Sequence, residues 1–232
     1  MYLISTGRDK SIIVWDLGKR SIVATLKPAD IARCFVISKN RLFAGLRDGS
    51  IVAWDFDDLS KPPTVLYQND HFTFFDIKYL EKKNWLVTAT DKGEMLFFDL
   101  NKSPATPVRL KDGKHSGIMY DIAVSPDGKW IASAGLDRIL KLWDLREIKK
   151  TEELTRIVPL DMPNKTGQVL ALQFDAQSQY LLFSDNQKMQ IRSVDIQKLY
   201  NKLKNNLKGK QLSKEQWGFY IKDKLKQPTI KY

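Results

Sequence analysis

Three polar residues near the middle of the chain are of the types that form a nucleophilic catalytic triad: His115, Ser133 and Asp137. In such a triad the imidazole lies between an exposed serine hydroxyl and a buried carboxylate, beside an oxyanion hole. The chemistry would be acyl transfer, with hydrolysis of an ester or an amide. Because these residue types seldom make an active site without a cleft and an oxyanion hole, a structural role is the stronger interpretation.

The other chemically reactive side chains predict no second kind of site. The chain has two histidines and one cysteine, which lie far apart and lack the close spacing of metal ligands. It also lacks a glycine-rich loop with the lysine that binds phosphates. Cys34 begins an apolar run that continues to Ile37, which is typical of a small core residue. We therefore expect no metal, no cofactor and no enzymatic activity.

Length and composition favour a globular protein. The chain has 232 residues, of which 43% are hydrophobic, enough for one large all-β domain or two small ones. No apolar run approaches the ~18 residues that span a membrane, and the apolar start Met1–Ile4 is too short for a secretory signal. A single cysteine excludes an intramolecular disulfide. These features predict a cytoplasmic protein.

Five segments end alike, in an aromatic or apolar anchor that directly precedes an aspartate. The anchors are Trp15, Trp54, Phe98, Trp143 and Val194, at spacings of 39, 44, 45 and 51 residues. Each anchor follows a second short apolar run, and turns such as Arg47-Asp48-Gly49 separate the two runs. Aspartate and glycine tolerate the positive φ of tight hairpins, so each unit is predicted to contain two antiparallel strands. A repeat of this length indicates an array of similar structural units.

The fourth unit carries the fullest pattern. Its landmarks are His115, Ser125-Pro126-Asp127-Gly128, Ile131-Ala132-Ser133-Ala134-Gly135, Asp137 and Leu142-Trp143-Asp144-Leu145. In this combination of motifs, residues 1–196 resemble the WD-repeat family. The resemblance implies an all-β fold, a β-propeller built from four-stranded antiparallel blades.

The family pattern also gives a count of strands. It places the second strand of one blade at Met1–Gly7 and the third strand of another at Met189–Val194. Three complete blades lie between them, which makes eighteen strands, or about four and a half blades. Rings of this family commonly have seven blades, and open strand edges invite aggregation. We therefore expect the chain to be the C-terminal part of a larger ring in a longer protein.

The resemblance implies a structural role for the triad-like residues. In WD repeats, a histidine ahead of the first strand, a serine or threonine of the second strand, the turn aspartate and the tryptophan of the third strand form a buried hydrogen-bond chain. Such a chain satisfies buried polar groups and fixes the geometry of the blade. Its members in the fourth unit are His115, Ser133, Asp137 and Trp143. The third unit has His71 and Thr88, but Lys92 and Phe98 replace the aspartate and the tryptophan.

The resemblance also implies a contact surface, on the face of the propeller that carries the turn aspartates. Binding is concentrated in exposed residues on rigid scaffolds, and arginine and aromatic side chains dominate interface energies. The candidates are the residue before each turn aspartate and the residue just inside the first strand of each blade. They are Arg8, Arg47 and Leu136 in the first set, and Phe75, Tyr120 and Leu170 in the second, with Ala32 in the second blade. In the alternative interpretation, Phe75 and Tyr120 pack against neighbouring blades.

Residues 197–232 are predicted to form a basic C-terminal extension. They hold ten lysines, no arginine and two acidic residues, a net charge of +8 within the +11 of the whole chain. Apolar residues at helical spacing and a capping box at 213–216 predict short α-helices. The apolar stripe is Ile196, Leu199, Tyr200, Leu203 and Leu207. The run Leu212–Tyr220 resembles the segment that follows propellers in bacterial multidomain signalling proteins with NTPase, caspase-like or TIR-like effector domains.

Together these features predict a non-catalytic protein-binding scaffold or sensor module. The signalling resemblance implies an effector domain in the same, longer polypeptide, and the identity of any protein partner is left open. The alternative is electrostatic binding of nucleic acid or of a membrane surface by the lysine-rich extension. Nucleic-acid binding is the weaker hypothesis, because the extension has no arginine and because net charge alone indicates non-specific affinity.

Overall fold

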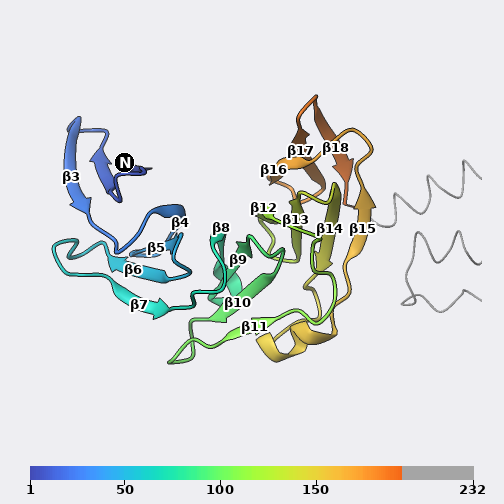
Figure 1. Cartoon of the computed structure of the whole chain (residues 1–232), viewed down its shortest axis with the longest axis horizontal. Helices are drawn as coiled ribbons and strands as arrows, with labels where there is room; N and C mark the ends of the chain where they lie inside the picture. The colour runs from blue at the N-terminus through green and yellow to red at the C-terminus, as the bar shows by residue number, and fades with distance from the viewer. Residues whose placement is uncertain (195–232) are drawn as a thin grey trace, which may run out of the picture.

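The computed structural model describes residues 1–194, and these residues form an all-β structure (Figure 1). The described part contains eighteen strands in five separate antiparallel sheets, together with the short 3₁₀ helices η1 (Glu81–Lys83) and η2 (Thr151–Arg156). The predicted all-β fold with four-stranded antiparallel sheets is confirmed. The predicted helical extension lies outside the described residues. No helix of the described part is long and apolar enough to cross a membrane.

The sheets are numbered here in chain order, and the first and last have three strands each. Sheet 1 contains β1 (Tyr2–Thr6), β2 (Ile12–Asp16) and β3 (Ser21–Leu26). Sheet 2 contains β4 (Ala32–Ser38), β5 (Arg41–Leu46), β6 (Ile51–Asp55) and β7 (Thr64–Tyr67). Sheet 3 contains β8 (Phe74–Leu80), β9 (Trp85–Thr90), β10 (Met95–Asp99) and β11 (Pro107–Arg109). Sheet 4 contains β12 (Met119–Val124), β13 (Trp130–Gly135), β14 (Ile139–Asp144) and β15 (Leu160–Pro163). Sheet 5 contains β16 (Val169–Phe174), β17 (Tyr180–Asp185) and β18 (Met189–Ser193).

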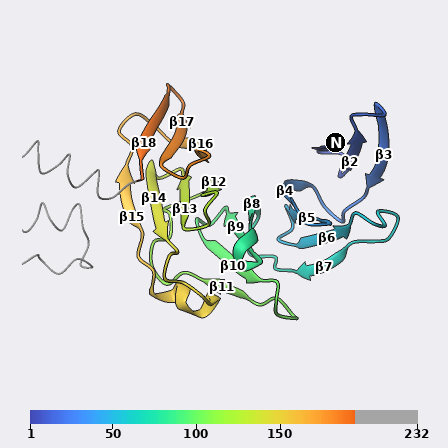
Figure 2. The same cartoon turned by 180° about the vertical axis from the view of Figure 1, so that it is seen from behind.

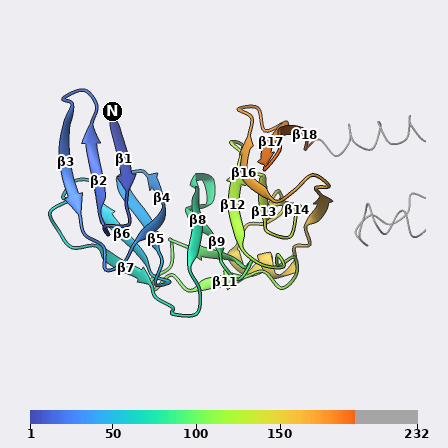
Figure 3. The same ribbon diagram turned by 45° about the horizontal axis from the view of Figure 1, so that its top comes forward.

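The five sheets follow one another along an open arc (Figures 1 and 2). Strands β4, β8, β12 and β16 lie on the inside of the arc, and β3, β7, β11 and β15 lie on its outside. Within each sheet, consecutive strands pair in chain order, so every sheet is a meander of hairpins. Sheets 1 and 5 stand at the two ends of the arc (Figure 3). This arrangement is consistent with a series of propeller blades.

The tight turns between β1 and β2, β5 and β6, β9 and β10, and β13 and β14 share one backbone feature. The third turn residue has a positive φ in each of four turns: Lys10 (57°), Gly49 (82°), Gly93 (73°) and Arg138 (62°). The turn aspartates do not take the positive φ themselves, which differs from the expectation. Instead, Asp137 Oδ1 accepts the backbone N–H of Ile139 at 3.1 Å, and Asp48 makes the equivalent bond to Ser50 at 2.9 Å. The aspartate thus closes the turn with its side chain.

A β-bulge interrupts each inner strand close to its beginning. The pairing register skips one residue in each strand: Arg33 in β4, Phe75 in β8, Tyr120 in β12 and Leu170 in β16. A bulged residue has no direct partner on the neighbouring strand, so its side chain can point away from the ladder. All four bulges lie at the end of the sheets that carries the tight turns, because the inner strands begin where their neighbours end.

The core consists of apolar layers between consecutive sheets. Between sheets 3 and 4, for example, Trp85 and Phe97 pack with Ile131 and Trp143. Burial stabilises by ~25 cal/mol per Å² of apolar surface, so each sheet depends on its neighbours as in other repeat proteins. Ile191 of sheet 5 is 63% exposed, and it lies on the face that has no neighbour among the described residues.

Candidate functional site

The three triad candidates lie together in sheet 4. The His115 Nδ1 atom is 2.9 and 3.0 Å from the two carboxylate oxygens of Asp137, and His115 Nε2 is 2.8 Å from Ser133 Oγ. Trp143 donates its indole N–H to the same Ser133 oxygen at 3.0 Å. A neutral imidazole with its proton on Nδ1 donates to Asp137 and accepts the hydroxyl proton of Ser133. The hydrogen bonds therefore connect serine, histidine and aspartate in the order found in a catalytic triad.

Burial separates this arrangement from a working active site. Ser133 and the His115 side chain are 0% exposed, and the Asp137 side chain is 7% exposed. The serine oxygen already accepts the indole N–H of Trp143, and an acyl carbonyl cannot reach it without opening the blade. A nucleophile must be accessible to its substrate. The chain of bonds instead satisfies buried polar groups and ties the loop ahead of β12 to β13, β14 and their turn.

Asp137 is the charged end of this chain. Burial acts to raise the pKa of Asp137, but hydrogen bonds from His115 and from the backbone N–H groups of Ser116 and Ile139 outweigh it and lower that pKa. The Ser116 bond is 3.1 Å long. Hydrogen bonds to a carboxylate favour its ionised form. Asp137 is therefore a carboxylate at neutral pH and anchors the loop that carries His115.

The corresponding positions of other sheets keep only parts of the chain. In sheet 1, Trp15 donates its indole N–H to Ser5 Oγ at 3.0 Å. In sheet 3, Thr88 is 0% exposed and its hydroxyl has no hydrogen-bond partner. The side chain of Phe98 has no N–H that could donate to the Thr88 hydroxyl. His71 is exposed, and its Nδ1 atom lies 3.3 Å from the carboxylate of Asp70. The replacements seen in the sequence thus leave a buried hydroxyl unsatisfied.

The three candidate contact residues next to the turns lie at one end of the sheets. Arg47 binds Asp30 through two hydrogen bonds of 3.0 Å each. The bond from Arg47, more than any other influence, lowers the pKa of Asp30 to about 2. Arg8 is exposed and Leu136 is 38% exposed. Among residues 1–194, the side chains of Arg8 and Leu136 are therefore open to solvent, whereas Asp30 holds the Arg47 guanidinium in place.

The other three candidates are bulged residues, and Arg33 completes their set. We call Arg33, Phe75, Tyr120 and Leu170 the bulge row. The Arg33 guanidinium lies 4.1 Å above the centre of the Phe75 ring, and the Phe75 and Tyr120 ring centroids are 6.3 Å apart in an edge-to-face arrangement. Phe75 and Tyr120 are half-buried, whereas Arg33 and Leu170 are exposed. The two aromatic rings thus pack against neighbouring side chains and also keep an accessible face.

Sequence reasoning missed Arg33 because it aligned Ala32 with Phe75. In the structure, Ala32 pairs with Leu46 as Phe74 pairs with Thr90, so the counterpart of Phe75 is the residue after Ala32. A signal for this was present in the sequence. Each bulged residue stands between a buried apolar residue and a small or acidic one: Ala32-Arg33-Cys34, Phe74-Phe75-Asp76, Met119-Tyr120-Asp121 and Val169-Leu170-Ala171.

Two carboxylates next to the bulge row join the inner strands to one another. Asp76 Oδ2 accepts the backbone N–H of Ile122 at 2.9 Å, and Asp121 Oδ2 accepts that of Leu172 at 2.6 Å. Lys78 Nζ lies 2.9 Å from Asp76 and 3.7 Å from Asp121. Burial, followed by the hydrogen bond and charge of Asp76, raises the pKa of Asp121 to about 7. These bonds fix the spacing between the strands that carry Phe75, Tyr120 and Leu170.

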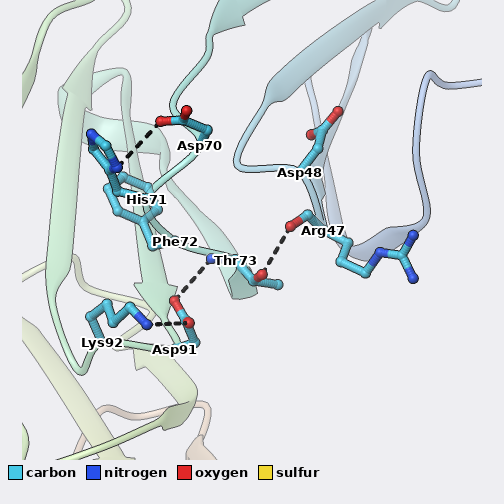
Figure 4. A pocket seen from close by; sticks show the side chains of 8 residues that line it. All are labelled: Arg47, Asp48, Asp70, His71, Phe72, Thr73, Asp91 and Lys92. Carbon is cyan, nitrogen blue, oxygen red and sulfur yellow. Dashed lines mark hydrogen bonds and ion pairs between the residues drawn. The ribbon is translucent and has the colours of Figure 1, made fainter.

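An open pocket lies at the end of sheets 2 and 3 that carries the tight turns (Figure 4). Its lining consists of Arg47, Asp48, Asp70, His71, Phe72, Thr73, Asp91 and Lys92. Thr73 joins the two sides, because its hydroxyl donates to the Arg47 carbonyl at 2.8 Å and its N–H donates to Asp91 at 2.9 Å. The charges of both signs around the pocket suit polar groups of a partner better than an apolar ligand. Of this set, only Arg47 was among the contact residues predicted from the sequence. Within residues 1–194, no cluster of three or more histidine, cysteine or acidic side chains could hold a metal ion.

Comparisons with known proteins agree with the repeat seen in the sequence. DNA damage-binding protein CMR1 of Scheffersomyces stipitis is 30% identical over 125 residues, which are 50% of this chain and 24% of that protein. Transducin-like enhancer protein 6 of Homo sapiens is 22% identical over 148 residues, 63% of this chain and 25% of that protein. Protein groucho of Drosophila melanogaster is 26% identical over 139 residues, 58% of this chain and 18% of that protein.

The chain spans a quarter or less of the length of these relatives. A family match covers residues 107–144, under the description "WD domain, G-beta repeat". This segment contains β11 to β14 and all four members of the buried hydrogen-bond chain of sheet 4. Residues 107–144 are therefore identified as a WD repeat, and the chain is similar over half or more of its length to WD-repeat proteins of yeast, human and fly.

Proposed function

We propose that this chain is a non-catalytic protein-binding scaffold or sensor module that holds a partner on the end of the sheets where the inner strands begin. The observation that carries the proposal is the bulge row, in which Arg33 contacts Phe75 and Phe75 contacts Tyr120, across three sheets. Aromatic residues and arginine are the most frequent energetic centres of protein interfaces. The contact surface combines the bulge row with the turn residues Arg8, Arg47 and Leu136.

Two features support binding rather than catalysis. The only triad-like group in the described residues has a serine that is fully buried and already hydrogen-bonded to Trp143. The bulge row, in contrast, lies on strands that are tied together by Asp76 and Asp121. A rigid platform loses little conformational entropy when a partner docks, which favours binding.

Selection of random peptides displayed on phage, with the full chain immobilised, tests the proposal. The selected peptides should bind the wild type and bind the double variant Phe75→Ala/Tyr120→Ala at least about tenfold more weakly, since each truncation removes an anchor. Tyr180→Ala is the matched control, because Tyr180 is 40% exposed on the free face of sheet 5. Peptides that bind the double variant with the same affinity as the wild type would place the binding surface elsewhere.

The cellular context is a further part of the proposal. A cytoplasmic signalling role, with an effector domain in the same polypeptide, rests on the resemblance of residues 212–220 to the end of bacterial signalling proteins. Those residues lie outside the described structure. Sequencing the gene on the upstream side of the Met1 codon tests it: a continuous open reading frame with further blades and an effector domain is expected, and a stop codon directly upstream would contradict it.

Electrostatic binding through the lysine-rich extension is the second candidate function. Residues 197–232 carry ten lysines, and one relative is named as a DNA damage-binding protein, although the match covers 24% of that protein. Binding of this kind weakens steeply with salt, because lysines displace counterions from phosphates. Titrations with duplex DNA and with anionic vesicles across salt concentrations test it. Absence of binding at low salt would reject this function and leave the first untouched.

A further inference from the structure

Arg33 differs in its side-chain contacts from Arg47, the arginine of the neighbouring turn. Its guanidinium is stacked on the Phe75 ring at 4.1 Å, and the residue is exposed at the bulge of β4. Arg47, in contrast, binds Asp30. Arg33 has no carboxylate partner among residues 1–194. Its charge is therefore oriented by an aromatic ring but not neutralised.

A guanidinium that lies over an aromatic ring can keep its hydrogen-bonding edge free. A guanidinium is planar, and its five N–H donors lie in that plane, so contact of its face with a ring does not consume them. Two parallel donors match the two oxygens of a carboxylate, and such bidentate pairs are among the strongest hydrogen bonds in proteins. The stack on Phe75 also reduces the number of side-chain conformations that must be lost on binding.

Beyond Arg33, the bulge row continues with Phe75, Tyr120 and Leu170, which are largely apolar. Phe75 and Tyr120 present half-buried rings, and Leu170 is 46% exposed at the equivalent bulge of β16. A ligand that pairs with Arg33 therefore meets an apolar platform on one side. The complementary ligand has a carboxylate next to apolar side chains.

The charge of the surroundings selects a singly charged group. Lys78 is held by Asp76 and Asp121, and Arg47 is held by Asp30. A phosphoryl group carries nearly two negative charges at neutral pH and is typically bound by more than one cation. Within the bulge row Arg33 is the one cation, and one guanidinium matches one carboxylate.

We propose that Arg33 recognises an aspartate or glutamate side chain of a protein partner, in a segment whose neighbouring apolar side chains pack on Phe75, Tyr120 and Leu170. This inference rests on the proposed function and adds the chemistry of the partner. The carboxylate oxygens accept two N–H bonds from Arg33, and the ring of Phe75 holds the guanidinium in register with them. The partner segment is thus acidic and apolar at adjacent positions.

The peptides selected on the wild-type chain provide the probe. Each acidic residue of a selected peptide is replaced in turn by its amide, and both forms are titrated against the wild type and against Arg33→Gln. We expect one Glu→Gln or Asp→Asn change to weaken binding to the wild type at least about tenfold, as for a charge-assisted pair. The same change should have little effect on binding to Arg33→Gln, because the pair is already absent. Arg33→Lys should bind with intermediate strength, since it keeps the charge but not the fork.

Arg41 supplies a matched control. Its guanidinium lies 4.8 Å from the centre of the Phe43 ring, at the opposite end of sheet 2, where β5 begins and β4 ends. Arg41→Gln removes the same charge and the same kind of stack, and it should leave peptide binding unchanged. Melting curves of all variants verify that they are folded.

The possible outcomes separate this inference from the proposed function. Selected peptides without an acidic residue, or amide changes that weaken binding equally in the wild type and in Arg33→Gln, overturn the role of Arg33. Phosphoserine peptides that bind more than about tenfold better than their glutamate counterparts overturn the choice of carboxylate. In each of these cases, sensitivity to Phe75→Ala/Tyr120→Ala still supports the proposed function. Failure to select any peptide counts against both.

Discussion

The indole N–H of Trp143 donates a hydrogen bond of 3.0 Å to Ser133, and Trp15 makes a bond of the same length to Ser5 in another sheet. The surroundings of the two bonds differ. Trp143 is 1% exposed between sheets 3 and 4, whereas Trp15 is half-buried on the free face of sheet 1. The two tryptophans therefore make the same kind of hydrogen bond and differ in burial. Comparing them separates the contribution of the hydrogen bond to stability from the contribution of apolar packing.

Trp143→Ala should destabilise the protein by ~3–5 kcal/mol, as expected for removal of a large side chain from a packed core. Trp15→Ala should cost clearly less, because less apolar surface and no enclosed cavity is involved. Chemical denaturation followed by circular dichroism measures both. Equal losses for the two variants would contradict the idea that packing between sheets, rather than the hydrogen bond, stabilises the blade.

His115→Ala should reduce stability without removing any chemistry. The substitution leaves Ser133 and Asp137 without their shared partner, and the loss of a buried hydrogen-bonding group costs ~1–3 kcal/mol. His71→Ala is the matched control and should be nearly neutral, because His71 is exposed. Thermal unfolding and assays with activated esters are the measurements. Ester turnover that disappears in His115→Ala at an unchanged melting temperature would show that the triad-like group is catalytic.

Much of the fold could be predicted from the repeat. The first and last strands, predicted at Met1–Gly7 and Met189–Val194, are found at Tyr2–Thr6 and Met189–Ser193, and the count of eighteen strands is confirmed for the described residues. Anchors and turns recur at similar distances along the chain, so local sequence determines where the strands begin and end. The partners of His115 were also predictable, since they occupy fixed positions of the repeat.

The alternation of apolar residues within one strand does not predict the bulges, and only a comparison of the four inner strands aligns the skipped residues. A bulge is a property of two paired strands, and the alternation of one strand does not reveal which residue its partner skips. This is why Ala32 was aligned with Phe75 and Arg33 was missed. The η2 helix and the pocket around Thr73 depend on loops whose contacts come from distant segments, such as the bond from Thr73 to the Arg47 carbonyl.

Thr88→Val should stabilise the protein. The Thr88 hydroxyl is buried without a hydrogen-bond partner, and an unsatisfied buried hydroxyl costs ~1–3 kcal/mol. Valine has nearly the same shape and removes the polar atom, so a gain of about 1 kcal/mol is expected. Ser133→Ala is the matched change at the equivalent position and should destabilise, because Ser133 is bonded to His115 and Trp143. A destabilised Thr88→Val protein would show that the hydroxyl has a partner in solution.

Asp121 should make stability depend on pH in the neutral range. Its pKa is raised to about 7, first by burial and then by Asp76, whereas an aspartate in an unfolded chain titrates near ~3.9. Between these values the folded protein binds a proton that the unfolded chain has released, so this group lowers stability progressively as pH rises from about 4 to about 7. Above that range the loss is complete and constant.

Asp121→Asn removes this titration and should therefore gain stability relative to the wild type as pH rises through the same range. The amide oxygen can still accept the backbone N–H of Leu172, which Asp121 accepts in the wild type.

Asp76→Asn is the informative second variant: it removes the neighbouring carboxylate that helps to raise the pKa of Asp121, so the fall in stability should move to lower pH. Lys78 faces both carboxylates and remains in each variant. Urea unfolding at several pH values between about 4 and about 8 gives the three curves. If the curve of Asp121→Asn runs parallel to that of the wild type, Asp121 does not titrate in this range, and the bond to Leu172 holds a permanently charged carboxylate.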